Sequence, residues 1–211
     1  MSDQRIYVAQ DTIEAAGEGT WMASKGSKMG FQVVMDFYTQ MAIEGRCFHV
    51  RAGTITTPLT GDIAVTDTAA EMCVDAQTGY TVIPTRLNIS VESINGGTLP
   101  EAYAKSVAAI STAGTAFIPL PILTGGAAAS TTARVTAAGG VTVTAELATT
   151  TRQHFANTIT AQADRILANE TLRGIVLPGP ACFYVQVAGT TAGPTYFGNL
   201  DYIELPTTAV S

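Results

Sequence analysis

The sequence predicts an all-β protein, mainly an antiparallel β-sandwich of the jelly-roll type, with one or two short helices. Several segments alternate apolar and polar residues with a period of two, which is typical of strands that bury one face. Glycine, proline and threonine separate these segments at short intervals, as the turns of a β-sandwich do. We find no internal repeat that would favour a propeller or a solenoid.

Residues 1–28 predict an N-terminal arm, and residues 29–211 predict a single jelly-roll domain. The arm is polar and contains glycine, and its apolar residues are too sparse to build a core. Trp21 and Met22 stand out in it, because leaving such side chains in water costs up to roughly 3 kcal/mol each. We therefore expect Trp21 and Met22 to bind a neighbouring subunit at an interface.

The segment 29–45, at the start of the predicted domain, fits both a helix and a strand. Its apolar residues form one helical stripe, which contains Phe31, Val34, Tyr38 and Met41. The first half of the segment, however, also alternates like a strand. Its length and the terminating Gly45 favour a helix in the second half.

Three segments, 47–52, 86–93 and 141–148, predict half-buried antiparallel strands, because each alternates apolar and polar residues. The segment 117–123, FIPLPIL, contains two prolines and can therefore be only an edge strand or an extended segment outside the ladder. The small residues of 124–140 predict a mobile loop or a hairpin tip. The buried sides of the three strands are predicted to contain Phe48, Val50 and Ala52; Leu87, Ile89 and Val91; and Val141, Val143, Ala145 and Leu147.

Two further segments, 100–113 and 158–170, fit either a short helix or a strand. The first places Pro100 at a plausible first helical position and has apolar residues in helical register. The second has a similar helical stripe. We expect short helices in both, although strands surround them.

The segment 181–206, ACFYVQVAGTTAGPTYFGNLDYIELP, predicts a β-hairpin. Two apolar, aromatic-rich runs flank the turn residues TTAGP. The alternation of the second run slips at Gly198 and Asn199, which indicates a bulge.

Composition and charge exclude several functional classes. The 11 basic and 17 acidic residues give a net charge of -6, and no basic cluster is longer than Lys25 with Lys28. Direct nucleic-acid binding is therefore not expected, because it needs several cations on one surface. No apolar run approaches the ~20 residues that span a bilayer, and no signal peptide is visible. A charged content of only 13% favours a protein whose flanks are covered by neighbouring subunits.

The sequence offers no catalytic, cofactor-binding or metal-binding site, so we expect no enzyme and no cofactor. His49 and His154 are isolated from each other, and a metal site needs more convergent ligands. No common catalytic motif is present. Cys47, Cys73 and Cys182 are far apart and are expected to be ordinary buried thiols. Four acids lie close together but match no calcium-binding loop, so we expect solvated carboxylates at Asp62, Asp67, Glu71 and Asp75.

Three stretches of this sequence resemble the jelly-roll capsid-type virion structural proteins of environmental bacteriophages and related viruses. They are EGRCFHVRAGTITTPLTG at 44–61, GYTVIPTRLNISVES at 79–93 and the closing AGPTYFGNLDYIELP. The resemblance rests on a glycine-bounded strand that enters a Thr/Pro turn, on the G-x-x-V-I-P strand entry, and on a terminal hairpin that ends in Glu-Leu-Pro.

This resemblance implies a capsid subunit, made in the host cytoplasm and located in the virion. Its partners would be copies of itself in a symmetric homo-oligomer, together with other virion proteins. The alternative function is a virion decoration protein, a fibre-head domain, or a receptor- or carbohydrate-binding module. A sugar site would need exposed aromatic platforms, and the chain has one Trp.

Overall fold

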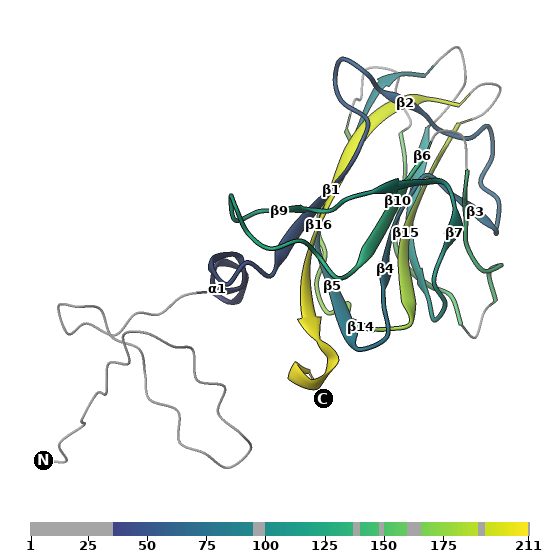
Figure 1. The fold of residues 1–211 in the computed structure, drawn as a ribbon. Helices are drawn as coiled ribbons and strands as arrows, with labels where there is room; N and C mark the ends of the chain where they lie inside the picture. Colours follow the sequence, from purple (N-terminus) through teal and green to yellow (C-terminus); the bar gives the residue numbers. More distant parts are fainter. Residues whose placement is uncertain are drawn as a thin grey trace, which may run out of the picture. The chain divides into compact units, whose positions relative to one another are not determined.

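A computed structural model of the chain describes residues 36–94, 100–136, 140–147, 150–159, 166–189 and 193–210. The regular structure in these residues is nearly all β-strand, and the strands pair antiparallel in two main sheets (Figure 1). The predicted all-β sandwich is therefore confirmed. The compact unit that contains these strands extends from Met41 to Ser211.

One α-helix and sixteen strands make up the described part of the chain, together with a final 3-10 turn. In chain order they are α1 (Phe37–Ile43), β1 (Cys47–Ala52), β2 (Leu59–Thr60), β3 (Ala69–Ala70), β4 (Met72–Ala76), β5 (Tyr80–Ser93), β6 (Glu101–Val107), β7 (Thr112–Ala113), β8 (Thr115–Phe117), β9 (Leu120–Pro121), β10 (Thr132–Val135), β11 (Val141–Thr142), β12 (Arg152–Thr158), β13 (Ile166–Thr171), β14 (Leu177–Pro178), β15 (Ala181–Ala188), β16 (Thr195–Pro206) and η1 (Thr207–Ala209).

The two main sheets have the strand pairing of a jelly roll. The first sheet has the order β13-β5-β16-β1-β9, and the second has the order β12-β6-β15-β4-β10-β8. Eight strands pair in a nested way along the chain: β1 with β16, β4 with β15, β5 with β13, and β6 with β12. This nesting forms one long hairpin, and the pairs β5–β16 and β6–β15 roll it into two sheets.

The long connection between β6 and β12 adds five short strands to this framework. Strand β9 extends the first sheet beyond β1, while β10 and β8 extend the second sheet beyond β4. Strands β7 and β11 join β3 in a separate three-stranded sheet. This third sheet could not be predicted from the sequence, because two-residue strands show no periodicity.

The main core lies between the inner faces of the two large sheets and contains aliphatic and aromatic residues from both. A second core lies on the outer face of the second sheet. Ala70 and Val141 of the third sheet belong to it, so the third sheet covers that face. As a result β15 is buried on both faces along its whole length. The second core consists of Ala70, Cys73, Val107, Val141, Val143, Cys182 and Tyr184.

The predicted closing hairpin is wrong. Strand β15 pairs with β4 and β6 in the second sheet, whereas β16 pairs with β1 and β5 in the first. The turn between them therefore connects the two sheets, and the two strands do not pair. A short turn between two apolar strands has the same sequence signature whether the strands form a hairpin or belong to different sheets. The difference lies in their pairing partners, which are far away in the chain and leave no local signal.

The helices expected in 100–113 and 158–170 are also wrong where the structure describes them. Residues 101–107 form β6 and residues 166–171 form β13, while 160–165 lie outside the described residues. Strand β6 lies between β12 and β15, and its cross-strand contacts outweigh a weak helical stripe. The helix predicted in the second half of 29–45 is confirmed as α1, and residues 29–35 are not described.

Three smaller expectations need correction. The predicted loop 124–140 contains β10, which pairs with both β4 and β8. Among the described residues 141–147, only Val141 and Thr142 form a strand, and Leu147 is exposed. The irregularities of β16 lie at 195–196 and 201–202 instead of at Gly198. Gly198 instead lets the backbones of β16 and β5 approach closely, because a Cβ at this position would lie 2.6 Å from the Asn88 carbonyl oxygen of β5.

Candidate functional site

The residues predicted for an interface, Trp21 and Met22, lie outside the described part of the chain, as does the whole predicted arm 1–28. Their role stays a prediction.

The expected edge segment 117–123 is confirmed, because β9 ends the first sheet.

The two histidines belong to different sheets, and each has one polar side-chain partner. His49 on β1 lies opposite Asp201, with its Nδ1 2.7 Å from the carboxylate. His154 lies in a bulge of β12, its Nε2 is 2.7 Å from the Ser106 hydroxyl, and its ring stacks on Phe183. Burial, and to a smaller extent Arg152, lower the pKa of His154, so the neutral imidazole is favoured.

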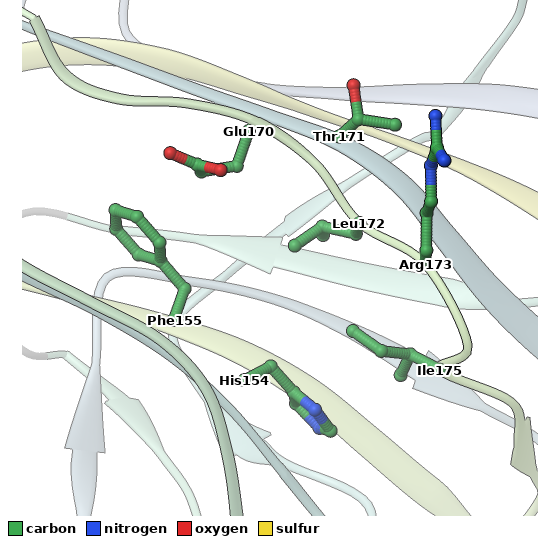
Figure 2. A pocket seen from close by; sticks show the side chains of 7 residues that line it. All are labelled: His154, Phe155, Glu170, Thr171, Leu172, Arg173 and Ile175. Carbon is green, nitrogen blue, oxygen red and sulfur yellow. The ribbon is translucent and has the colours of Figure 1, made fainter.

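A pocket of about 310 Å³ opens beside His154, at the edge where β12 and β13 end the two sheets. Figure 2 shows Phe155, Leu172 and Ile175 turned toward it, whereas the side chain of Arg173 extends away. The pocket can bind a small group with an apolar part. Ser106 is buried beneath His154 and is not among the lining residues, so it is not placed to attack a bound ligand.

Two of the four acids expected to be solvated are buried, which corrects that prediction. Glu71 and Asp75 are 2% and 1% exposed. Glu71 accepts a hydrogen bond of 2.8 Å from the backbone N–H of Val187. The segment that leads into β7 of the third sheet lies against Asp75, and the sequence did not predict that sheet. Asp62 is half-buried and Asp67 is exposed.

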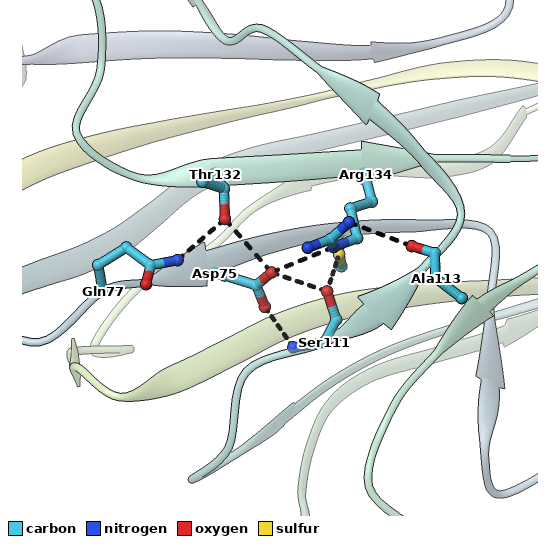
Figure 3. Close-up of polar contacts among 7 residues, drawn as sticks. Asp75, Gln77, Ser111, Ala113, Thr132 and Arg134 are labelled. Carbon is cyan, nitrogen blue, oxygen red and sulfur yellow. Dashed lines mark hydrogen bonds and ion pairs between the residues drawn. The ribbon is translucent and has the colours of Figure 1, made fainter.

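Asp75 is the centre of a buried polar network (Figure 3). Its Oδ1 accepts a 2.8 Å hydrogen bond from the Ser111 backbone N–H, and its Oδ2 accepts one of 2.7 Å from the Ser111 hydroxyl. Thr132 donates a longer hydrogen bond of 3.5 Å to Oδ2, and Nε of Arg134 lies 3.8 Å from the same oxygen. The network thus joins β4, β10 and the segment before β7.

All three cysteines are buried and free, as predicted for ordinary buried thiols. Cys47 lies in the first sheet, and burial raises its pKa to about 12. Cys73 and Cys182, by contrast, lie together with Asp75, and their ligand atoms are all within 4.8 Å of one another. Burial, and then the neighbouring Cys73 and Asp75, raise the pKa of Cys182 well above its usual value.

The closeness of Cys73 and Cys182 could not be predicted from the sequence, because the two residues are far apart along the chain. Only the pairing of β4 with β15 brings them together. One feature of the sequence could have indicated part of this cluster: Cys73 and Asp75 are two residues apart, so in a strand both lie on the same face.

An exposed apolar surface follows β9 at the edge of the first sheet. We call it the apolar edge; its members are Ile118, which is 77% exposed, and Leu120, Ile122 and Leu123, which are 48%, 39% and 43% exposed.

The backbone of this edge is poorly suited to bind another strand. Ile122 donates its N–H to the Cys47 carbonyl, at 2.9 Å, so the nitrogen of the preceding Pro121 faces away from β1. That nitrogen carries no hydrogen, and the open side of the edge lacks a donor at this position. A protein bound here would therefore contact mainly the apolar side chains.

Comparisons with protein-family models, with curated proteins and with solved structures find no match. Among the described residues, no helix is both long enough and apolar enough to cross a membrane.

Proposed function

We propose that this chain is a virion structural protein, a capsid subunit whose copies assemble into a shell or capsomer. The observation that carries the proposal is the apolar edge, which exposes four large aliphatic side chains within residues 118–123 on a sparsely charged jelly roll. Exposed apolar patches of this kind mark contacts between proteins. Jelly rolls are also a common architecture of viral shells. The sequence resemblance points to the same class.

The chemistry of the edge favours a second copy of the chain as its partner. Strand addition at β9 is disfavoured because Pro121 offers no outward donor, so the contact would consist of packed aliphatic side chains. A subunit with 13% charged residues has little charge to repel another copy. Closed symmetry then repeats each modest contact around the particle.

The mass of the purified chain in solution tests this proposal. We expect a defined oligomer by light scattering, and we expect the double variant Ile118→Asp, Leu120→Asp to shift it to monomers. The control Ile63→Asp changes a similarly exposed isoleucine, 60% exposed, in the connection between β2 and β3 and should keep the oligomer. A chain that is monomeric at every concentration and salt tested, or that turns over a substrate, would contradict the proposal.

The pocket beside His154 favours the second candidate, a receptor- or carbohydrate-binding module of the virion. Its lining combines the Phe155 ring with the carboxylate of Glu170, a mixture that suits a polar ligand with one apolar face. A glycan array separates the candidates. If the chain is monomeric and binds a glycan specifically, and Phe155→Ala abolishes that binding, the second candidate is favoured over the first.

A further inference from the structure

The outer face of the second sheet brings two thiols and a carboxylate together at its centre. Cys73 and Asp75 are two residues apart on β4, so their side chains point to the same face. Cys182 on β15 stands directly opposite Asp75. The three ligand atoms lie within 4.8 Å of one another, and all three residues are almost completely buried, with at most 1% exposed.

From this arrangement we infer that Cys73, Cys182 and Asp75 bind one zinc ion. Zinc binds thiolate sulfur at about 2.3 Å and carboxylate oxygen at about 2.0–2.2 Å, so ligand atoms around one tetrahedral ion lie roughly 3.5–4 Å apart. The observed cluster fits this spacing with small side-chain adjustments. Two thiolates favour zinc over magnesium or calcium, which prefer oxygen ligands.

Ser111 supplies the surroundings that such a site requires. Its hydroxyl oxygen is 2.7 Å from Oδ2 of Asp75 (Figure 3). The same oxygen is 3.0 Å from the Cys73 sulfur. This oxygen lies where a fourth ligand, or a hydrogen bond to a ligand, belongs. The Ser111 backbone N–H holds the other carboxylate oxygen at 2.8 Å, and outer hydrogen bonds of this kind orient carboxylate ligands.

Arg134 balances the charge of the site. Two thiolates and the Asp75 carboxylate carry three negative charges, of which a zinc ion neutralises two. The guanidinium of Arg134 neutralises the third, since its Nε lies 3.8 Å from Oδ2 of Asp75. That Nε is buried and has no hydrogen-bond partner within the described segments. A metal-bound cluster would therefore be electrically neutral in this buried position.

A disulfide between the two thiols fits the backbone less well. Cys182 pairs with Asp75, so Cys73 is its diagonal neighbour. Diagonal neighbours on antiparallel strands have Cα atoms about 7–8 Å apart, whereas disulfides usually need about 4.4–6.8 Å. A metal ion can join these side chains without moving the strands.

The site would be structural, because it is closed to solvent. Ser111 immediately precedes β7, so the cluster fastens the third sheet to the middle of the second. The ion would enter while the chain folds. This inference is independent of the proposed self-association.

Metal analysis of the full chain, expressed with added zinc and purified without a histidine tag, tests the inference. After dialysis against a chelator we expect one zinc per chain, and we expect the Cys73→Ser, Cys182→Ser double variant to contain none. Cys47→Ser is the matched control, since it removes the third buried thiol from the other sheet and should keep the zinc. Absence of zinc in the wild-type chain, or equal zinc in the double variant, overturns the inference.

A second measurement covers the case in which the double variant does not fold. The wild-type chain is unfolded with a chelator and refolded with Co²⁺ as the probe. Strong thiolate-to-cobalt charge-transfer absorption, equally strong in Cys47→Ser, supports the site. A refolded chain without this absorption overturns it.

Discussion

The side chain of Glu204 fixes a loop of this jelly roll, the segment before β10, through hydrogen bonds. Its buried carboxylate accepts hydrogen bonds from the backbone N–H groups of Ser130 and Thr131, the closest at 2.7 Å. The Thr131 hydroxyl also lies 2.6 Å from the Tyr202 hydroxyl. These contacts attach the segment before β10 to the inner face of β16.

We expect Glu204→Ala to lower the free energy of unfolding by about 3 kcal/mol, because it leaves the buried backbone N–H of Thr131, and also that of Ser130, without an acceptor. Urea denaturation followed by circular dichroism measures the change. Glu170→Ala, which removes an exposed carboxylate from β13, should change the stability by no more than about 0.5 kcal/mol. Equal stability of Glu204→Ala and the wild-type chain would show that the carboxylate does not hold the loop.

His154 predicts a pH dependence of stability. Because its pKa is lowered in the folded chain, the unfolded chain binds a proton first as the pH falls. The contribution of His154 to the free energy of unfolding is thus complete above about pH 6.5, the usual pKa of histidine. It is lost as the pH falls toward the lower pKa that His154 has in the folded chain. We expect His154→Gln, which can still bond Ser106, to lose less stability than wild type between pH 7 and pH 5. Urea denaturation at several pH values measures the free energy of unfolding of both chains. If it falls by the same amount in wild type and in His154→Gln between pH 7 and pH 5, the prediction is wrong.

At the scale of elements, the sequence predicts best the strands that bury one face. In β1 and β5 the alternation is clear, and Phe48, Val50, Leu87 and Ile89 are buried as expected. Strand β6 was missed because its last four residues are buried on both faces, so the strand shows no strict alternation. The nested pairing was only partly foreseeable, since long-range partners leave no local signal.

The candidate sites were less predictable than the strands. The apolar edge could be inferred in part, because prolines in FIPLPIL indicate an edge strand whose aliphatic residues have few neighbours. The cluster of Cys73, Asp75 and Cys182 could not, since it depends on the register between β4 and β15. The burial of Asp75 depends in turn on strands of the third sheet that are too short to predict.

The edge strand β9 yields an element-scale prediction. Pro121→Thr restores an N–H donor on the open side of the first sheet, where β9 presents its unpaired backbone. We expect this variant to form irregular, growing aggregates that light scattering detects with time. Pro58→Thr, in the turn before β2, is the control and should behave like the wild-type chain. A stable particle size for Pro121→Thr would mean that the missing donor does not protect the edge.

At the scale of the whole molecule, two sheets and a small third sheet bury most apolar side chains, yet the apolar edge stays exposed. Ion pairs contribute little to the described surface: the pairs present are His49 with Asp201, Lys105 with Glu146, and Arg134 with Asp75. Contacts between copies would accordingly depend on apolar packing and hydrogen bonds.

This composition predicts that assembly resists salt. At about 1 M salt the screening length falls to ~3 Å, which weakens exposed ion pairs but leaves apolar packing intact. Salts that are excluded from protein surfaces even strengthen apolar burial. We therefore expect the oligomer mass, measured by light scattering, to stay constant from dilute buffer to about 1 M salt. The Ile118→Asp, Leu120→Asp variant serves as the monomeric reference. Dissociation of the wild-type oligomer by salt alone would show that charge pairs, and not the apolar edge, hold the copies together.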